Sequence, residues 1–195
     1  SFVDFSPTFL EVGKVDFDSS GMAAFAGKSL IPIFNTEEEG KTDPSRNAVL
    51  IGKERHDIGR PDDQGYPIRG IVNEEYTYIH NFETGRWPGG NPETGYLNTD
   101  GSPTKTVILN QRRVSGEMKY WNLAFGKTPL NNLIKEQARI KEELFKQLKA
   151  QEDPRMFGNG EIFDNYEYAQ ESQRDFYNRY MKGESFKTGW VNESD

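Results

Sequence analysis

The segment 67–82 constrains the fold most, because apolar and polar residues alternate along it in two runs. A period of two extends through 68–72 and again through 76–80, which is typical of strands that bury one face. The residues between these runs, 73–75, suit a tight turn. The segment therefore predicts a β-hairpin and, with it, a small antiparallel sheet. We interpret His80, in the second strand, as a packed side chain rather than a ligand.

Another strand is predicted at 48–51, where a short apolar run ends at a glycine. Such a run is typical of a buried strand. Five consecutive ionisable residues follow it, 53–57, and then a loop rich in Gly, Pro and Asp. A strand that delivers charged side chains to a loop is a common way to build a polar site. The plainer alternative is a solvated loop at a strand end, and the residues alone leave both interpretations open.

Helices are predicted before and after these strands in the sequence. Residues 5–12 suit a short helix with Pro7 in its first turn. A longer helix is predicted at 129–150, with apolar side chains on one broad face, and a last helix at 165–181. Residues 106–109 suit either a strand or the start of a helix. The pattern predicts an α+β fold, in which a small antiparallel sheet of about four strands packs with a long helix.

The segment 83–105 contains five glycines and three prolines, so we expect it to be irregular. A loop of this length is usually functional or packed on a neighbouring element. Trp87 within it is a natural wall for a sugar ring, and it is equally suited to anchor the loop to the core. Both interpretations of Trp87 remain open.

Composition excludes several classes of function. The chain has 24 basic and 31 acidic residues and a net charge of −7, which argues against a nucleic-acid partner. It has no cysteine, so it forms no disulfide, no thiolate metal site and no cysteine nucleophile. No apolar run approaches the roughly 20 residues that span a membrane, so we expect no membrane partner. The chain starts abruptly, without Met, which predicts a piece of a longer protein.

Motifs along nearly the whole chain resemble those of sulfatases, in the alkaline phosphatase-like superfamily. Ser1–Gly13 is similar to a segment late in the sulfatase catalytic domain, and 27–32 is similar to the Gly-x-Ser-Leu-x-Pro stretch that follows it. The middle and late motifs resemble the heparan N-sulfatase (N-sulfoglucosamine sulfohydrolase)-like group. These motifs are GKERHD at 52–57, GYPIRGI at 65–71, EYTYIHNF at 75–82, RWP at 86–88, NPETGY at 91–96, SPTK at 102–105 and DPR at 153–155 with GNG at 158–160.

The resemblance implies a fragment. Residues 1–58 would be the tail of the α/β catalytic domain, with the strand at 48–51 in its large sheet, and 59–195 would be the C-terminal subdomain. The parent protein would be periplasmic or secreted and would hydrolyse sulfate from a heparan-type glucosamine. Its formylglycine nucleophile and its calcium ion would both be supplied by the missing N-terminal catalytic domain. The sequence Thr-Asp-Pro-Ser-Arg at 42–46 imitates the formylglycine motif, but Thr42 is not a residue type that is converted.

In this interpretation the chain has no catalytic or metal-binding residue and closes the pocket around a sulfated sugar. The substrate-binding candidates are Glu54, Arg55, His56, Asp57, Arg60 and Trp87. An arginine can pair with a sulfate or carboxylate at two points, and His56 or Glu54 can hydrogen-bond the sugar. Alternatively, Arg55 and Arg60 make salt bridges across the domain junction. The alternative function is a non-catalytic carbohydrate-binding or structural domain, and fold analogy also allows a phosphoesterase.

Overall fold

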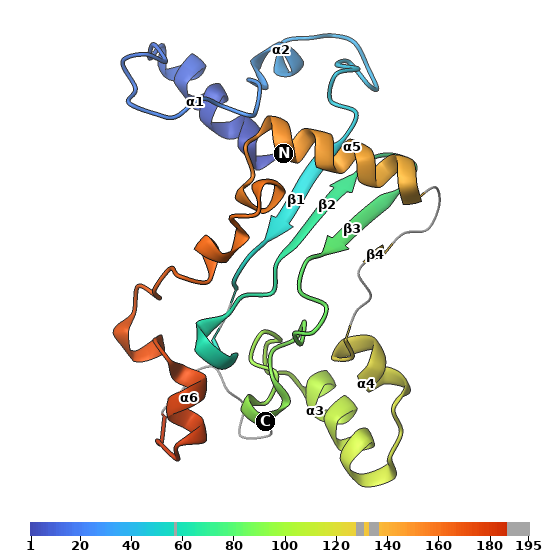
Figure 1. Ribbon diagram of the computed structural model, residues 1–195. Helices are drawn as coiled ribbons and strands as arrows, with labels where there is room; N and C mark the ends of the chain where they lie inside the picture. Colours follow the sequence, from blue (N-terminus) through green and yellow to red (C-terminus); the bar gives the residue numbers. More distant parts are fainter. Residues whose placement is uncertain (57, 128–130, 133–136, 187–195) are drawn as a thin grey trace. The chain divides into compact units, whose positions relative to one another are not determined.

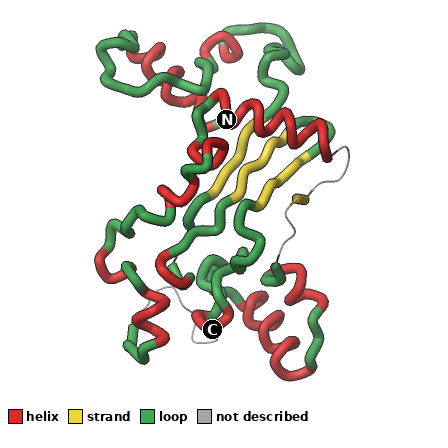
Figure 2. Tube along the Cα trace, in the orientation of Figure 1, coloured by secondary structure: helices red, strands yellow, loops and turns green. Residues whose placement is uncertain are grey.

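The computed structural model describes residues 1–56, 58–127, 131–132 and 137–186. It is an α+β protein with a small antiparallel sheet and several helices (Figure 1), which confirms the predicted class. Long irregular stretches connect these elements (Figure 2). No helix among the described residues is both long enough and apolar enough to cross a membrane.

Two compact units make up the chain. Unit 1 comprises Ser1–Val49 and Val72–Glu75, and unit 2 comprises Leu50–Ile71 and Tyr76–Asp195. The domain boundary expected after residue 58 stays a prediction. It was inferred from the resemblance to sulfatases, whereas the two units are defined by contacts within this chain.

The sheet has its strands in chain order, β1-β2-β3-β4. The strands are β1 (Val49–Lys53), β2 (Ile68–Val72), β3 (Thr77–Asn81) and the two-residue β4 (Asn131–Asn132). The arrows of β1, β2 and β3 alternate in direction in Figure 1, and β4 is antiparallel to β3 with Ile79 opposite Asn132. The predicted hairpin over 67–82 is thereby confirmed.

β1 lies at an edge of this sheet. The strand was correctly predicted, but its burial and its sheet were not. Val49 and Ile51 are 39% and 38% exposed, and β1 pairs with β2 in the small sheet rather than joining a large one. An edge strand has a neighbour on one side only, so an apolar run does not guarantee a buried position.

The α-helices are α1 (Phe5–Gly13), α2 (Ile31–Phe34), α3 (Pro103–Asn110), α4 (Lys119–Ala124), α5 (Gln137–Ala150) and α6 (Phe176–Met181). Short 3-10 turns lie at Phe2–Asp4, Pro61–Asp63, Pro92–Thr94, Pro154–Phe157, Gly160–Phe163 and Glu171–Gln173, and a π-helical turn lies at Gln111–Ser115.

α5 lies across one face of the sheet (Figure 1). Ile140, Leu144 and Leu148 are buried along it, and their spacing of four residues places them on one side of a helix. The predicted start at 129 is wrong for the described residues, because Asn131 and Asn132 form β4 instead. A backbone next to a sheet edge gains hydrogen bonds there that local helix propensity does not anticipate.

Two other helix predictions are decided by the structure. Residues 106–109 belong to α3, whose N-cap Ser102 accepts a hydrogen bond from the backbone N–H of Lys105 at 3.1 Å. The last helix is limited to α6, so the prediction of a helix from 165 is wrong. The backbone before α6 is used in contacts with another loop of unit 2, and these contacts replace helical hydrogen bonds.

Unit 1 is built around its first residues, Ser1–Gly13. The Thr8 hydroxyl donates to the Asp4 carbonyl at 2.6 Å and accepts from the Leu30 N–H at 2.9 Å. The Asp4 carboxylate accepts from the Lys28 N–H at 2.9 Å. A Cβ on Gly27 would lie 2.2 Å from the Val3 carbonyl oxygen, so only glycine fits there. In this unit these residues join two segments of backbone.

Candidate functional site

The loop 54–66 connects β1 to β2 in unit 2 and carries most of the predicted site residues. The Tyr66 N–H donates to the Glu54 carbonyl at 2.7 Å, which brings the ends of the loop together. A Cβ on Gly65 would lie 2.3 Å from that same carbonyl oxygen. Asp62 and Asp63 have φ of 53° and 54°, in the left-handed region that costs a non-glycine residue about 1 kcal/mol or more.

Glu54 faces the protein. Its carboxylate accepts from Arg155 at two points, 2.8 Å and 2.6 Å, and it is 2.5 Å from Arg69. Arg69 in turn pairs with Asp153 at 2.5 Å. These four charges form one network that lies mostly away from solvent. Burial alone would lower the pKa of Arg69, but Asp153 and Glu54 raise it above its ordinary value.

The two candidate arginines of the loop are hydrogen-bonded to backbone carbonyls. Arg55 donates to the carbonyls of Asp63, at 3.1 Å, and of Tyr166, and its guanidinium lies 4.1 Å from the centroid of the Tyr168 ring. Arg60 is 1% exposed and donates to the Trp87 carbonyl at 2.8 Å and 3.1 Å. Both arginines therefore make contacts with carbonyl oxygens of the protein, and the salt bridges expected across the domain junction stay a prediction. Their contact with a ligand stays a prediction.

Among the described candidates, His56 is the exposed residue. Within the part of the chain that the structure describes, its imidazole has no hydrogen-bond or ion-pair partner. Asp57, the next predicted residue, lies outside the described residues. His56 is therefore the candidate whose side chain is available to a ligand without first breaking a contact that the structure shows.

Two cations lie near the Tyr66 ring, although residues 53–66 contain four acidic and three basic side chains. Lys53 Nζ and Arg60 Cζ lie 5.9 Å and 5.8 Å from the centroid of the Tyr66 ring. Burial, and then the charge of Arg60, lower the pKa of Lys53.

Trp87 packs into an aromatic cluster. Its ring stands edge-on to Trp121 with centroids 5.9 Å apart, against a buried group that also includes Tyr96 and Phe125. The Lys127 ammonium lies 5.1 Å from the Trp87 ring centroid. Of the two interpretations of Trp87, these contacts favour the anchor over the sugar-stacking wall.

Residues outside the loop 54–66 also bind it, and they were not among the candidates predicted from the sequence. Asp164 accepts from the Gly65 N–H at 3.1 Å and from Arg86 at 3.2 Å and 3.0 Å. Arg155 holds Glu54, as described above. The motif at 153–160 was noticeable in the sequence, but a pairing partner about 100 residues away is not visible from local pattern.

The carboxyl group of Asp164 makes the stability of unit 2 depend on pH. Burial would raise the pKa of its carboxyl, but hydrogen bonds from Arg86 and the Gly65 N–H, and the charges of Arg86 and Arg155, outweigh burial and hold the pKa below its ordinary value of 3.8. A lowered folded-state pKa contributes stability at pH above 3.8, and this contribution is lost as pH falls through the folded-state value.

We therefore expect the Asp164→Asn variant to be less stable than the original chain near neutral pH, and the difference to shrink in acid. Tryptophan fluorescence during urea unfolding, from about pH 7 to about pH 2.5, measures this difference. A difference that stays constant over the whole range would show that the Asp164 charge does not contribute.

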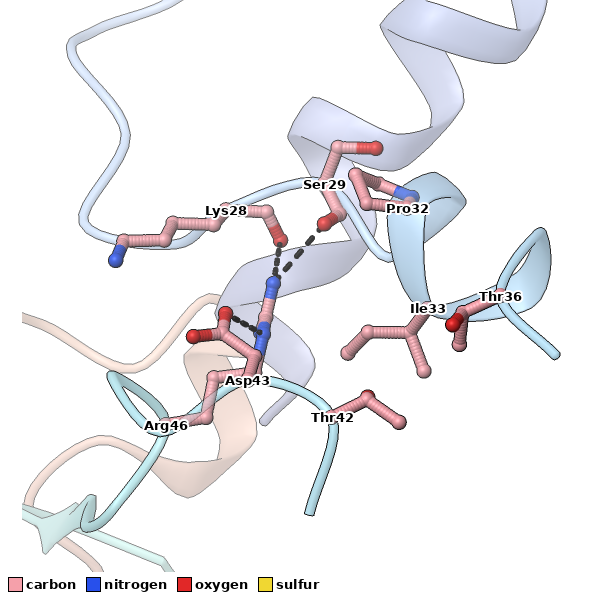
Figure 3. Close-up of a pocket in the computed structure, with 8 residues that line it drawn as sticks. All are labelled: Lys28, Ser29, Pro32, Ile33, Thr36, Thr42, Asp43 and Arg46. Atoms are coloured by element: carbon pink, nitrogen blue, oxygen red, sulfur yellow. Dashed lines mark hydrogen bonds and ion pairs between the residues drawn. The ribbon is translucent and has the colours of Figure 1, made fainter. Parts of the chain in front are cut away.

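A pocket of about 390 Å³ lies in unit 1 (Figure 3). It is lined by Lys28, Ser29, Pro32, Ile33, Thr36, Thr42, Asp43 and Arg46. Each of the three guanidinium nitrogens of Arg46 is bound: to Asp43 at 3.1 Å, to Asp4 at 2.8 Å, and to the carbonyls of Lys28 and Ser29 at 2.9 Å. Arg46, the arginine of the Thr-Asp-Pro-Ser-Arg sequence at 42–46, thus joins loops of unit 1.

Among the described residues, no group of three or more His, Asp or Glu side chains is arranged to hold a metal ion. No family model matches the chain, and no curated protein matches it.

Proposed function

We propose that this chain is the C-terminal portion of a sulfatase, and that the loop 54–66 forms part of the wall of its sulfated-sugar pocket. The observation that carries the proposal is the exposed His56 on a loop whose neighbouring charged side chains are held by the protein. A fixed loop with one available polar side chain is suited to recognise a ligand at a defined position. The GKERHD and GYPIRGI motifs of the sequence lie in and around this loop.

The reaction itself would take place on polypeptide outside this chain. Formylglycine and calcium would belong to the N-terminal catalytic domain, and would supply the nucleophile and the stabilisation of the sulfuryl charge. The residues of this chain would orient the sugar, with His56 donating or accepting a hydrogen bond. A heparan-type glucosamine and a periplasmic or secreted location are part of the same proposal.

We expect the His56→Ala variant to bind an N-sulfated heparin disaccharide about tenfold more weakly, the usual effect of losing one hydrogen bond to a charged ligand. NMR titration follows both binding and the imidazole resonances, and the sequence contains only two histidines. Gln151→Ala, which changes an exposed side chain just after α5, is the control and should leave binding unchanged.

The second candidate is a structural domain without ligand, and the protein contacts of Arg55 and Arg60 favour it. It predicts no saturable binding and no shift of the His56 resonance at any disaccharide concentration. In either case we expect the chain alone not to hydrolyse a sulfated aryl ester in the presence of calcium. Turnover by the purified chain would contradict the proposed division of labour.

A further inference from the structure

The segment 153–178 follows α5 and contacts the loop 54–66 at successive points. It begins with Asp153, which accepts from the Arg155 N–H at 2.9 Å and also pairs with Arg69. This local turn orients the Arg155 side chain toward the start of the loop, where it binds Glu54 at two points. A two-point arginine–carboxylate pair fixes direction as well as distance.

Further along, the same segment holds the other end of the loop. Asp164 accepts from the Gly65 N–H at 3.1 Å and is itself held by Arg86. Two residues after Asp164, the Tyr166 carbonyl accepts from Arg55, beside His56.

The central turn of the loop is held as well. The Asp175 N–H donates to the Asp63 carboxylate at 2.7 Å, and the Asn178 amide donates to Asp62 at 3.2 Å. Asp62 and Asp63 both have left-handed backbone conformations. Such conformations persist only when surrounding contacts impose them. The loop therefore depends on the segment 153–178 for its shape.

We propose that the segment 153–178 is a clamp that sets the position of His56, and that Arg155 and Asp164 are positioning residues of the ligand site. The inference rests on the proposed function of the loop. The inference also connects two motifs that are separate in the sequence, GKERHD and DPR. The first contains His56, and Arg155 of the second binds Glu54, two residues before His56.

Hydrogen exchange of the full chain tests the holding. In Arg155→Met and in Asp164→Asn, we expect amides of 54–66 to exchange on the order of tenfold faster or more, with α3 and α5 unchanged. The His56 resonance should shift in the same variants. Lys41→Met, which breaks an exposed ion pair with Glu74 in unit 1, is the matched control and should change neither. Unchanged loop exchange in both variants overturns the clamp.

Affinity for the N-sulfated disaccharide tests the positioning. We expect Arg155→Met to weaken binding to about the extent of His56→Ala, and Arg155→Lys to recover only part of it, because lysine keeps the charge without the two-point geometry. If Arg155→Met does not fold, Asp164→Asn, which removes a less buried charge, decides the question.

The outcomes separate the two proposals. A loop that loosens while affinity stays unchanged shows a purely structural segment and overturns the positioning role. An original chain that binds no disaccharide overturns the proposed function, and the positioning role with it, while the exchange data still show whether the segment holds the loop.

Discussion

Replacing Arg69 with methionine is expected to destabilise unit 2 by about 3–5 kcal/mol, the usual effect of removing one partner from a buried charge network. The Arg69 side chain is 9% exposed and lies 2.5 Å from both Glu54 and Asp153. Its loss leaves two carboxylates close together with Arg155 as their remaining basic neighbour in this network. Methionine fills the volume, so the effect reports the charge and not a cavity.

Urea unfolding followed by tryptophan fluorescence measures this effect, because both described tryptophans, Trp87 and Trp121, belong to unit 2. Arg174→Met is the matched control. Arg174 pairs with Glu167, but the two side chains are 41% and 74% exposed, so the loss should stay within about 1 kcal/mol. Equal effects of the two substitutions would show that the Arg69 network does not stabilise the unit.

Replacing Gly27 with alanine is expected to disrupt unit 1, with a loss of about 3 kcal/mol or more from overpacking. The added Cβ would lie 2.2 Å from the Val3 carbonyl oxygen and 2.8 Å from the Asp4 nitrogen. Both are backbone atoms, so no side-chain rotation relieves the clash. The displaced backbone also carries the Lys28 N–H that donates to Asp4.

Unit 1 has no tryptophan or tyrosine, so hydrogen exchange is the suitable measurement. The amides of Lys28 and Leu30, which donate to Asp4 and Thr8, should lose protection in Gly27→Ala. Gly13→Ala is the control, because its Cβ meets only a side-chain atom at 3.5 Å. Retained protection in Gly27→Ala would contradict the packing described for this unit.

Local pattern was sufficient for the hairpin and for the class of fold. The alternation in 67–82 has a period typical of strands, and β2 and β3 form there. Burial does not alternate along β2, because the consecutive residues Arg69, Gly70 and Ile71 are all buried. The buried stripe of α5 likewise follows helical spacing. The extent of β1 was nearly right, but its exposure was not, because the sequence does not say which strand lies at an edge.

The candidate site was predictable as a place but not as an arrangement. Consecutive charged residues after a strand marked the loop, and His56 is exposed as a ligand-facing residue must be. The directions of Arg55, Arg60 and Trp87 were not predictable, since each depends on a partner distant in the chain.

The sequence by itself determined the small antiparallel sheet, its covering helix and the charged loop between β1 and β2, because these follow from periodicity and from turn residues next to one another in the chain. Only the tertiary structure decided which polar side chains of that loop are bound within the protein and that His56 is exposed to solvent. Glu54 meets Arg155 across about 100 residues, and the pairing of two charges at such a separation is set by the path of the whole backbone, to which neither residue's immediate neighbours give any guide.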